Sequence, residues 1–380
     1  MHEIEPKNFL QQPLQKRKEE NALRSLRKSS GLIDFASNDF LGLARSWKLQ
    51  NEIMEEYQKA AKDFSPFLGS GGSRLLAGHH EYFTMLEKEI AAFHNAKAGL
   101  IFNSGYAANM GLLASLLGSK DIALVDSESH ASVWDGIKCG KGKALVFRHN
   151  DPAHLHLQLQ KASRNFSRIF VCIASLYSMS GDIAPLADIC RMIKTYPAYL
   201  IVDEAHATGI FGPEGRGIAA RDNLEQEIFA RVHTFGKALG GCGAVVLGCK
   251  YLRDFLINFS RPFIYSTALP LYNLVHIRHA YKWMADAKDR RQNLQKLIAY
   301  FQHRSGGGKD NKKLLSPIQR IFVDGNQKAD KLAENLRKSG MDVRPIKYPT
   351  VRKKHCCLRV CLHSFNTFSE IDRLLNGVGL

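Results

Sequence analysis

The sequence predicts an α/β protein with a mostly parallel central sheet that is covered by helices on both faces. Between residues 100 and 247, short apolar segments typical of buried strands alternate with helical segments. The strands are expected at residues 100–102, 122–125, 144–147, 168–174, 199–202, 232–234 and 244–247. Repeated β-α units of this kind indicate a parallel sheet. Ligands of such sheets bind at the carboxyl ends of the strands, so the loops that follow these strands are the place to look for a site.

The rest of the chain reads as helices and a smaller C-terminal α+β domain. Helices are expected at residues 13–30 (with Pro13 in the first turn), 47–62, 81–94, 106–117, 152–163, 185–195 and 271–304. A β-α-β-β-α order is expected at residues 317–323, 327–338, 342–346, 358–362 and 369–375. We therefore expect an N-terminal segment (1–45), a large domain (46–270) and a small domain (271–380).

The composition and the charge limit the classes of protein to which this chain could belong. The 380 residues are 45% hydrophobic and 23% charged, which is ordinary for a globular protein. The net charge of +17 is unusual and could serve to bind nucleic acid, a membrane surface or a polyanionic substrate. The basic residues are spread along the chain without the fingerprint of a nucleic-acid module, which favours a phosphate-bearing or acidic partner over DNA. No signal peptide and no apolar run of membrane length is apparent, so we expect a cytoplasmic protein without a membrane role.

One cluster of cysteines and histidines could suggest a metal site. His355, Cys356, Cys357, Cys361 and His363 lie close together in the sequence. In an alternating strand, however, an arginine at position 359 shares a face with Cys357 and Cys361, and its charge opposes a cation there. We expect no metal.

A lysine and a carboxylate, each directly after a strand, are the strongest candidates for chemistry. Lys237 lies in T-F-G-K-A-L-G-G, where the small neighbours let its amine approach a ligand; a solvated lysine in a surface turn is the alternative. Asp203 ends the strand 199–202 and is followed by His206, although an acid that only bonds its own turn would look the same. Together the two supply what pyridoxal phosphate requires, a Schiff-base lysine and a carboxylate that keeps the pyridine nitrogen protonated.

Two glycine-containing segments could approach a ligand. Residues 69–74 (G-S-G-G-S-R) lack the phosphate-loop pattern and read equally well as a loop between helices. The strand at 100–102 turns at Gly105 and Tyr106 into a helix. This arrangement directs backbone N–H groups and the positive end of a helix outward, and it predicts an anion site there.

Eight motifs in order resemble those of the α-oxoamine synthases, pyridoxal phosphate enzymes with the aspartate aminotransferase fold (fold type I). They are G-S-G-G-S-R (69–74), F-N-S-G-Y-A-A-N (102–109), S-H-A-S (129–132), Y-S-M-S-G-D (177–182), V-D-E-A-H-A-T-G (202–209), G-P-E-G-R-G (212–217), T-F-G-K-A-L-G-G (234–241) and Y-S-T (265–267). The resemblance extends over roughly residues 24–375.

The resemblance implies a set of catalytic residues. Lys237 would hold the cofactor covalently and later remove the Cα proton of an amino acid, and Asp203 would pair with the pyridine nitrogen. His130 would stack on the ring, a simple helix cap being the alternative. His206 and Ser178 would bond the phenolic oxygen of the cofactor.

The resemblance also implies phosphate and substrate contacts. Gly105, Tyr106 and Thr234 would hold the phosphate, in agreement with the anion site above. Thr267 would reach the phosphate of a second subunit, because family members are homodimers. In the substrate site, Arg359 would bind the amino-acid carboxylate, and Arg24 and Asn38 would lie near the acyl group.

The implied reaction condenses L-alanine with a pimeloyl thioester, carried on CoA or on acyl carrier protein. The products are 8-amino-7-oxononanoate, CO2 and a free thiol, as in biotin biosynthesis. The alternatives are a sister enzyme such as a glycine C-acetyltransferase and, from another class, a basic nucleic-acid-binding protein. Departures from the family pattern at Ala174, Ser175, Ser180 and His363 leave the cofactor contacts intact and bear on acyl specificity.

Overall fold

The computed structural model describes residues 7–29, 31–306 and 315–380, which form two compact units. The larger unit comprises residues 38–178 and 182–293, and the smaller one comprises residues 1–37, 179–181 and 294–380. The boundaries suggested by the sequence were 45/46 and 270/271. The helix that follows residue 270 stays with the larger unit because it packs against two helices from the beginning of that unit.

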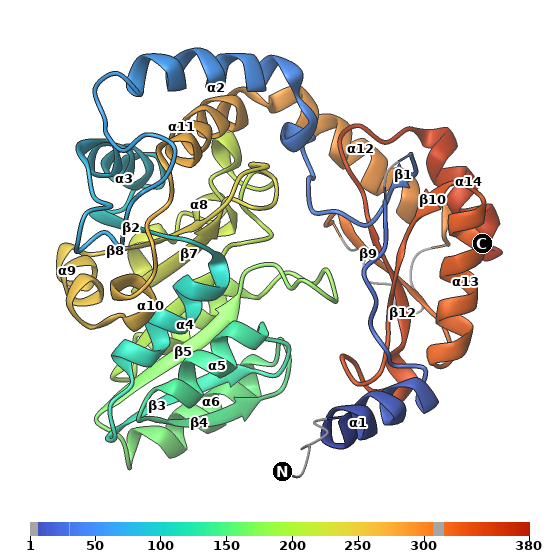
Figure 1. Cartoon of the computed structure of the whole chain (residues 1–380). Helices are drawn as coiled ribbons and strands as arrows, with labels where there is room; N and C mark the ends of the chain where they lie inside the picture. The colour runs from blue at the N-terminus through green and yellow to red at the C-terminus, as the bar shows by residue number, and fades with distance from the viewer. Residues whose placement is uncertain (1–6, 30, 307–314) are drawn as a thin grey trace, which may run out of the picture. The chain divides into compact units, whose positions relative to one another are not determined.

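The larger unit is built on a central sheet of seven strands within its described residues (Figure 1). The strands are β2 (Ala98–Phe102), β3 (Asp121–Asp126), β4 (Lys143–Phe147), β5 (Arg168–Ala174), β6 (Ala198–Asp203), β7 (Ala230–Thr234) and β8 (Ala244–Gly248). Their order is β2-β8-β7-β6-β5-β3-β4, and all neighbours pair in parallel except β8, which is antiparallel to both β2 and β7. The predicted mostly parallel sheet is confirmed.

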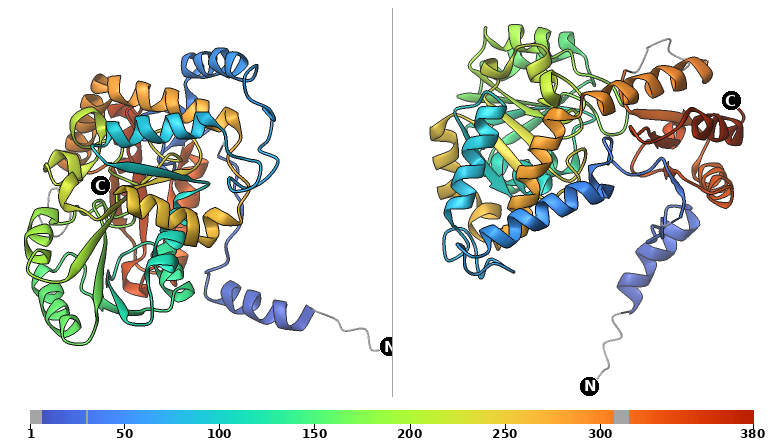
Figure 2. Two further views of the ribbon diagram at one scale, coloured as in Figure 1. Left: turned by 90° about the vertical axis from the view of Figure 1, so that its left-hand side faces the viewer. Right: turned by 90° about the horizontal axis from the view of Figure 1, so that it is seen from above.

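Apart from the edge strand β4, whose first four residues are exposed, both faces of this sheet are buried, because alternate side chains of each strand enter two different helical layers. Figure 2 shows helices on the two faces. On β5, Phe170 and Cys172 belong to the core beneath α4 (Gly105–Leu116) and α5 (Ala131–Cys139), whereas Ile169 and Val171 point to the opposite face. The other helices of this unit are α2 (Trp47–Ala60), α3 (Glu81–Phe93), α6 (Pro152–Ser163), α7 (Leu186–Ile193), α8 (Ile218–Arg221), α9 (Lys250–Phe259), α10 (Arg261–Ile264) and α11 (Leu271–Asp286).

The pairing directions bring functional segments to one edge of the sheet. β3, β5, β6 and β7 run parallel, and β2 points the same way because it is separated from β7 by the antiparallel strand β8. The segments after these strands therefore start from the same edge. They include the start of α4 at Gly105, the start of α5 after His130, and the ends of β6 at Asp203 and of β7 at Thr234.

The smaller unit contains two small sheets. β1 (Ile33–Asp34) pairs in parallel with β10 (Met341–Asp342), while β9 (Ile318–Phe322), β12 (Cys357–Cys361) and β11 (Arg344–Ile346) form an antiparallel sheet. The helices α13 (Asn326–Lys338) and α14 (Phe368–Val378) belong to this unit, and α12 (Lys288–Arg304) runs across the division at residues 293 and 294. The expected β-α-β-β-α order is present, but the strand expected at 342–346 is split between the two sheets at Val343.

Two expected helices differ from the structure. The helix expected at residues 13–30 is α1 (Lys7–Glu19), so Pro13 lies inside the helix and not in its first turn. The helix ends early because Asn21 adopts φ 51° and the N–H of Ala22 bonds back to the carbonyl of Arg17, a left-handed C-terminal cap. Residues 1–6 and Ser30 lie outside the described residues.

The helical region expected at 271–304 consists of two helices. α11 ends at Asp286 and α12 begins at Lys288, because Ala287 leaves the helical conformation (φ −77°, ψ 35°). The Arg291 guanidinium donates to the carbonyls of Met284 and Ala285 and so satisfies the end of α11. Among the described residues, no helix is long and apolar enough to cross a membrane, and no three potential metal-ligating side chains of His, Cys, Asp or Glu are grouped.

A buried acid next to Asp203 fixes the loop that leads to α8. Glu204 is fully buried, and its carboxylate accepts hydrogen bonds from the backbone N–H groups of Ile218 (2.8 Å) and Ala219 (3.0 Å). Gly217, at φ 109°, comes so close that an added Cβ would lie 2.1 Å from Glu204 Oε2. No other residue type fits at position 217.

We expect Gly217→Ala to lower the free energy of unfolding by about 3 kcal/mol, because it adds a clash with a buried carboxylate to backbone strain. The matched control is Gly71→Ala in the same unit, where φ is +66° and only the Pro66 side chain lies nearby, at 3.7 Å. Backbone strain alone should cost about 1 kcal/mol there. Urea unfolding of both variants measures the difference, and equal losses would contradict the proposed contact.

Candidate functional site

A cavity of about 190 Å³ lies at the sheet edge where the strand ends meet. It is lined by Gly105, Tyr106, Asn109, Glu128, His130, Ala174, Leu176, Tyr177, Ser178, Asp203, Ala205, His206, Val232, Thr234 and Lys237. Eight of the residues predicted from the sequence are among them: Lys237, Asp203, His130, His206, Ser178, Gly105, Tyr106 and Thr234.

Lys237 is presented by a tight loop between β7 and β8. The N–H of Gly240 donates to the Lys237 carbonyl (2.8 Å), and the N–H of Gly241 donates to the Phe235 carbonyl (2.7 Å). Gly240 needs to be glycine because it has φ 66° and because an added Cβ would lie 2.5 Å from the backbone nitrogen of Ala44. This glycine therefore serves the close packing of two backbones, while the lysine beside it lines the cavity.

Asp203, the last residue of β6, is held in one orientation by two donors. Asn109 Nδ2 donates to Oδ2 (2.8 Å), and the backbone N–H of Ala205 donates to Oδ1 (2.8 Å). An ionised carboxylate offers about four acceptor positions, so this one can still accept a proton-bearing ring nitrogen. Sequence reasoning missed the role of Asn109. The available signal was its spacing of four residues from Gly105, which places both on one face of α4.

The beginning of α4 supplies an anion site at another part of the cavity wall. Ser104 caps the helix by accepting from the N–H of Ala107 (3.1 Å), and the first turn contains no acidic residue. Gly105 lies against the side chain of Thr234, 3.5 Å from the position of an added Cβ. Backbone N–H groups at the positive end of a helix next to a hydroxyl suit a phosphate group.

His130 caps α5, as the alternative from the sequence suggested, and it also lines the cavity, while its expected stacking on a cofactor ring stays a prediction. Its Nδ1 accepts from the N–H of Ser132 (3.3 Å) and lies 2.8 Å from Ser132 Oγ, which is a helix cap. The same ring lines the cavity and meets the Tyr106 ring at 83° and 6.3 Å between centroids. Because the cap fixes the ring through one nitrogen, its orientation in the cavity is set by the helix.

His206 and Ser178 line the cavity from two further loops. His206 is 8% exposed, and its ring lies 6.2 Å from that of Phe40. Ser178 lies in the loop between β5 and α7. Besides Asn109, six lining residues were not predicted as site residues, among them Ala174 and Glu128. Ala174 pairs with Asp203 in the sheet, where the family resemblance suggests an acid, and Glu128 brings a carboxylate to the wall two residues before His130.

Four predicted residues do not line this cavity. Thr267 pairs with Ser73 in an isolated bridge, and its expected contact is to a second subunit. Asn38 is the first residue of the larger unit, and its carbonyl accepts from the N–H of Phe40. Arg24 donates to Thr350 (3.2 Å) and Arg359 to Cys361 (2.9 Å), both within the smaller unit. The phosphate contact of Thr267 and the substrate roles of Asn38, Arg24 and Arg359 stay predictions.

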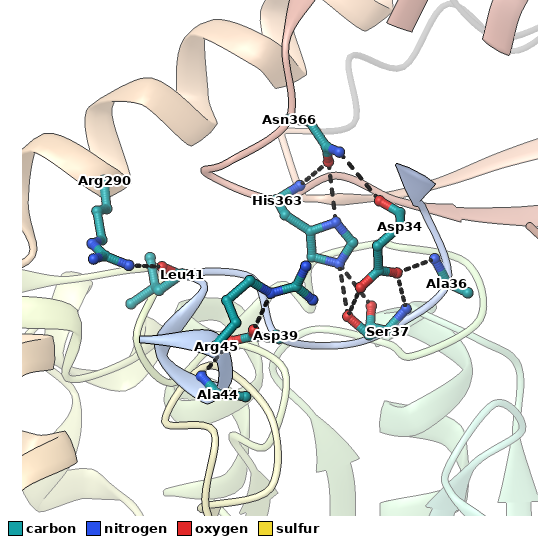
Figure 3. Close-up of polar contacts among 10 residues, drawn as sticks. All are labelled: Asp34, Ala36, Ser37, Asp39, Leu41, Ala44, Arg45, Arg290, His363 and Asn366. Carbon is teal, nitrogen blue, oxygen red and sulfur yellow. Dashed lines mark hydrogen bonds and ion pairs between the residues drawn. The ribbon is translucent and has the colours of Figure 1, made fainter. Parts of the chain in front are cut away.

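Figure 3 shows a buried histidine in the smaller unit, His363, whose two ring nitrogens both lie against oxygen atoms. The backbone N–H of His363 donates to Asn366 Oδ1 (2.9 Å), and the ring atom Nδ1 lies 3.1 Å from the same oxygen. Nε2 lies 3.0 Å from the Ser37 carbonyl, which can only accept. Ser37 Oγ meanwhile donates to Asp34 Oδ2 (2.7 Å). The ring is therefore held at both nitrogens, close to the Asp34 carboxylate.

The environment of Asp34 lowers the pKa of its carboxyl group. Burial raises the pKa of Asp34, but the Ser37 N–H, the charge of His363, the Ser37 hydroxyl and the Ala36 N–H outweigh it and hold the pKa well below its usual range. In the larger unit, Figure 3 also shows Asp39 accepting from the Arg45 side chain (3.0 Å) and from the Ala44 N–H (3.2 Å). Asp39 is thereby held in place just after Asn38.

The sheet, its helices and a cavity with lysine and carboxylate at the strand ends define a protein of the aminotransferase-like fold type I. The chain belongs to the aminotransferase class I and II family, whose sequence profile matches residues 30–378. It is 39% identical to the 8-amino-7-oxononanoate synthase of Emericella nidulans, over 98% of this chain and 95% of the relative. A putative 8-amino-7-oxononanoate synthase of Neisseria meningitidis is 36% identical, over 91% of this chain and 90% of the relative.

Solved structures show the same fold. The chain resembles the 8-amino-7-oxononanoate synthase of Francisella tularensis with a TM-score of 0.77 and 31% identity, over 91% of this chain and 96% of that one. It resembles the serine palmitoyltransferase of Sphingomonas wittichii with a TM-score of 0.87 and 23% identity, over 98% and 96% of the two chains. At this lower identity the likeness concerns the fold alone.

We expect His363→Gln to lower the free energy of unfolding of the smaller unit by about 2 kcal/mol at neutral pH, because it removes a buried ring that is held by Asn366 and the Ser37 carbonyl beside the Asp34 carboxylate. The depressed pKa of Asp34 contributes stability above the ordinary aspartate pKa of 3.8, and this contribution is lost as pH falls through the lower folded value. The difference from wild type should therefore shrink in acid.

Urea unfolding between pH 3 and 7 measures this difference. The control is His303→Gln, an exposed histidine of the same unit, which should change stability by less than about 0.5 kcal/mol. Equal stability of the two variants would contradict the stabilising role of the His363 hydrogen bonds.

Proposed function

We propose that this protein is a pyridoxal phosphate-dependent acyltransferase that condenses L-alanine with a pimeloyl thioester. The products are 8-amino-7-oxononanoate, CO2 and the free thiol, as in biotin biosynthesis. The observation that carries the proposal is the meeting of Lys237, Asp203 and the start of α4 in one cavity. These three supply an amine, a carboxylate and an anion site, which are the groups that this cofactor needs.

The residues present fit the cofactor. The α4 N-terminus at Gly105 and Tyr106, with Thr234, would bind its phosphate, and Asp203, oriented by Asn109, would accept from its ring nitrogen. When bound, pyridoxal phosphate supplies a conjugated, protonated ring that stabilises negative charge on the amino-acid Cα.

The side chains around the cofactor ring would each have a separate role in binding and catalysis. Lys237 would hold the cofactor covalently and take the Cα proton of alanine. His130, fixed by its cap, would lie on the ring face, and His206 and Ser178 would bond the phenolic oxygen. Asp203 is oriented before the ligand arrives, so its charge costs little reorganisation.

The choice of substrates rests on the relatives and not on the cavity. Relatives at 36–39% identity carry the name 8-amino-7-oxononanoate synthase, and each match spans at least 90% of both chains. In the substrate site, Arg359 would bind the alanine carboxylate, and Arg24 and Asn38 would lie near the acyl chain. A sister synthase, such as a glycine C-acetyltransferase, is the competing function, because Ala174 and His363 depart from the family pattern.

The assembly and the carrier belong to the same proposal. We infer a homodimer in which Thr267 reaches the phosphate of the second subunit. The net charge of +17 suits a polyanionic carrier, either CoA or an acidic acyl carrier protein. A basic nucleic-acid-binding protein is the alternative from another class. It would be retained on DNA in a salt-sensitive manner and would take up no cofactor.

Purified wild-type protein is expected to be yellow after addition of pyridoxal phosphate, and Lys237→Ala is expected to abolish the covalent form of the bound cofactor. Borohydride reduction followed by mass spectrometry should place the cofactor on residue 237. The control is Lys250→Ala at the exposed start of α9, which should behave like wild type. A colourless wild-type protein that binds no pyridoxal phosphate would refute the cofactor assignment.

A substrate panel distinguishes the acyltransferases. Alanine, glycine and serine are each combined with acetyl, pimeloyl and longer acyl thioesters, and release of free thiol and CO2 is measured. We expect alanine with a pimeloyl thioester to have the highest kcat/KM. Preference for glycine with acetyl-CoA would assign the sister function, and pimeloyl-CoA compared with pimeloyl-acyl carrier protein identifies the carrier.

A further inference from the structure

His149 is a second histidine whose two ring nitrogens both face acceptors, and it lies directly behind the wall of the cavity. His149 Nδ1 is 2.9 Å from Asp126 Oδ1, and Nε2 is 3.2 Å from Asp182 Oδ2 and 3.7 Å from Glu128 Oε2. An ionised carboxylate only accepts hydrogen bonds, so each nitrogen has to carry a proton. The side chain of His149 is 19% exposed, which makes this a largely buried cation among three acids.

We propose that His149 is a positioning residue of the cavity, whose doubly protonated ring joins Asp126 to Asp182 and thereby fixes the lining segments 128–130 and 176–178. The effect on the cofactor rests on the function proposed above. The bridge between the two acids rests on the geometry of this chain alone.

The first segment is held through Asp126, at the end of β3. Its Oδ1 accepts from His149 and also from the backbone N–H of Glu128 (2.8 Å), and its carbonyl accepts from the N–H of Ser129 (3.0 Å). Oδ2 accepts from the N–H of Asn150 (3.0 Å). This turn leads into His130, so a displacement of Asp126 displaces the residue that caps α5 and lines the cavity.

The second segment is held through Asp182. The N–H of Tyr177 donates to the Asp182 carbonyl (3.0 Å), and the Tyr177 ring stands perpendicular to the His149 ring at 4.4 Å. Next to this pair, Leu176 and Ile183 form a bridge, and Asn150 Nδ2 donates to the Ile183 carbonyl (3.3 Å). His149 thus contacts Tyr177 before Ser178 and Asp182 after it.

The charges around His149 keep it protonated at neutral pH. Burial lowers the pKa of His149, but hydrogen bonds to Asp126 and Asp182 and the charges of Asp126 and Glu128 outweigh burial and raise the pKa to about 9. Other titratable groups lie close to His149. Arg148 and Asp151 pair with one another (2.8 Å), and the phenol ring of Tyr177 packs against the His149 ring. The stabilisation is complete below the ordinary histidine pKa of 6.5 and is lost as pH rises through about 9.

The test compares wild type with His149→Gln and Asp182→Asn, each reconstituted with pyridoxal phosphate. A neutral amide cannot donate at both ends, so we expect His149→Gln to bind the cofactor about tenfold more weakly at pH 7.5. The ratio of wild-type to variant affinity should approach one as pH rises through about 9. In Asp182→Asn, the affinity for the cofactor should be lost at a lower pH than in wild type. His156→Gln on α6, whose ring contacts Tyr196 and Gln160 and no carboxylate, is the matched control and should bind normally.

A second measurement needs no cofactor and no active enzyme. Side-chain 15N NMR of histidine-labelled apoprotein, assigned with His149→Gln, should show both ring nitrogens of His149 protonated at pH 7.5. A neutral ring at that pH would overturn the bridge, whether or not the variant folds. If wild type binds pyridoxal phosphate and His149→Gln binds it equally well at pH 7.5, the positioning role is refuted while the proposed function stands. Wild type that binds no cofactor refutes the proposed function and the positioning role together.

Discussion

Buried and half-buried carboxylates at the ends of parallel strands determine how the loops of the site are arranged. A carboxylate placed there is withdrawn from water, and its acceptor positions have to be satisfied by nearby donors. Asp126 takes the backbone N–H groups of Glu128 and Asn150, Asp203 takes Asn109 and the N–H of Ala205, and Glu204 takes two N–H groups at the start of α8. Each set of donors fixes one loop around the cavity or next to it.

Two histidines extend this arrangement. His149 joins Asp126 to Asp182 in the larger unit, and His363 joins the Ser37 backbone to Asn366 close to Asp34 in the smaller unit. In both cases each ring nitrogen lies against an oxygen that accepts hydrogen bonds. The ring of His149 acts as a rigid link as long as it is charged, which makes the segments that it holds sensitive to pH.

The cavity itself was largely predictable. A lysine and an aspartate after successive strands, with a glycine turn before a helix, led to Lys237, Asp203 and Gly105, and all three line one cavity. The role of Asn109 was missed because an asparagine within an apolar helix has no distinctive pattern, although its spacing from Gly105 was available. His149 was missed because its partners come from three separate segments of the chain.

The sequence by itself determined the alternation of strands and helices, the buried sheet and the chemical types at the strand ends, because these depend on local periodicity and on residue type. Only the tertiary structure decided the strand order and the split strand at Val343. It also decided which donor satisfies which buried acid. These features depend on contacts between segments far apart in the chain, and such contacts leave no periodic signal in any one segment.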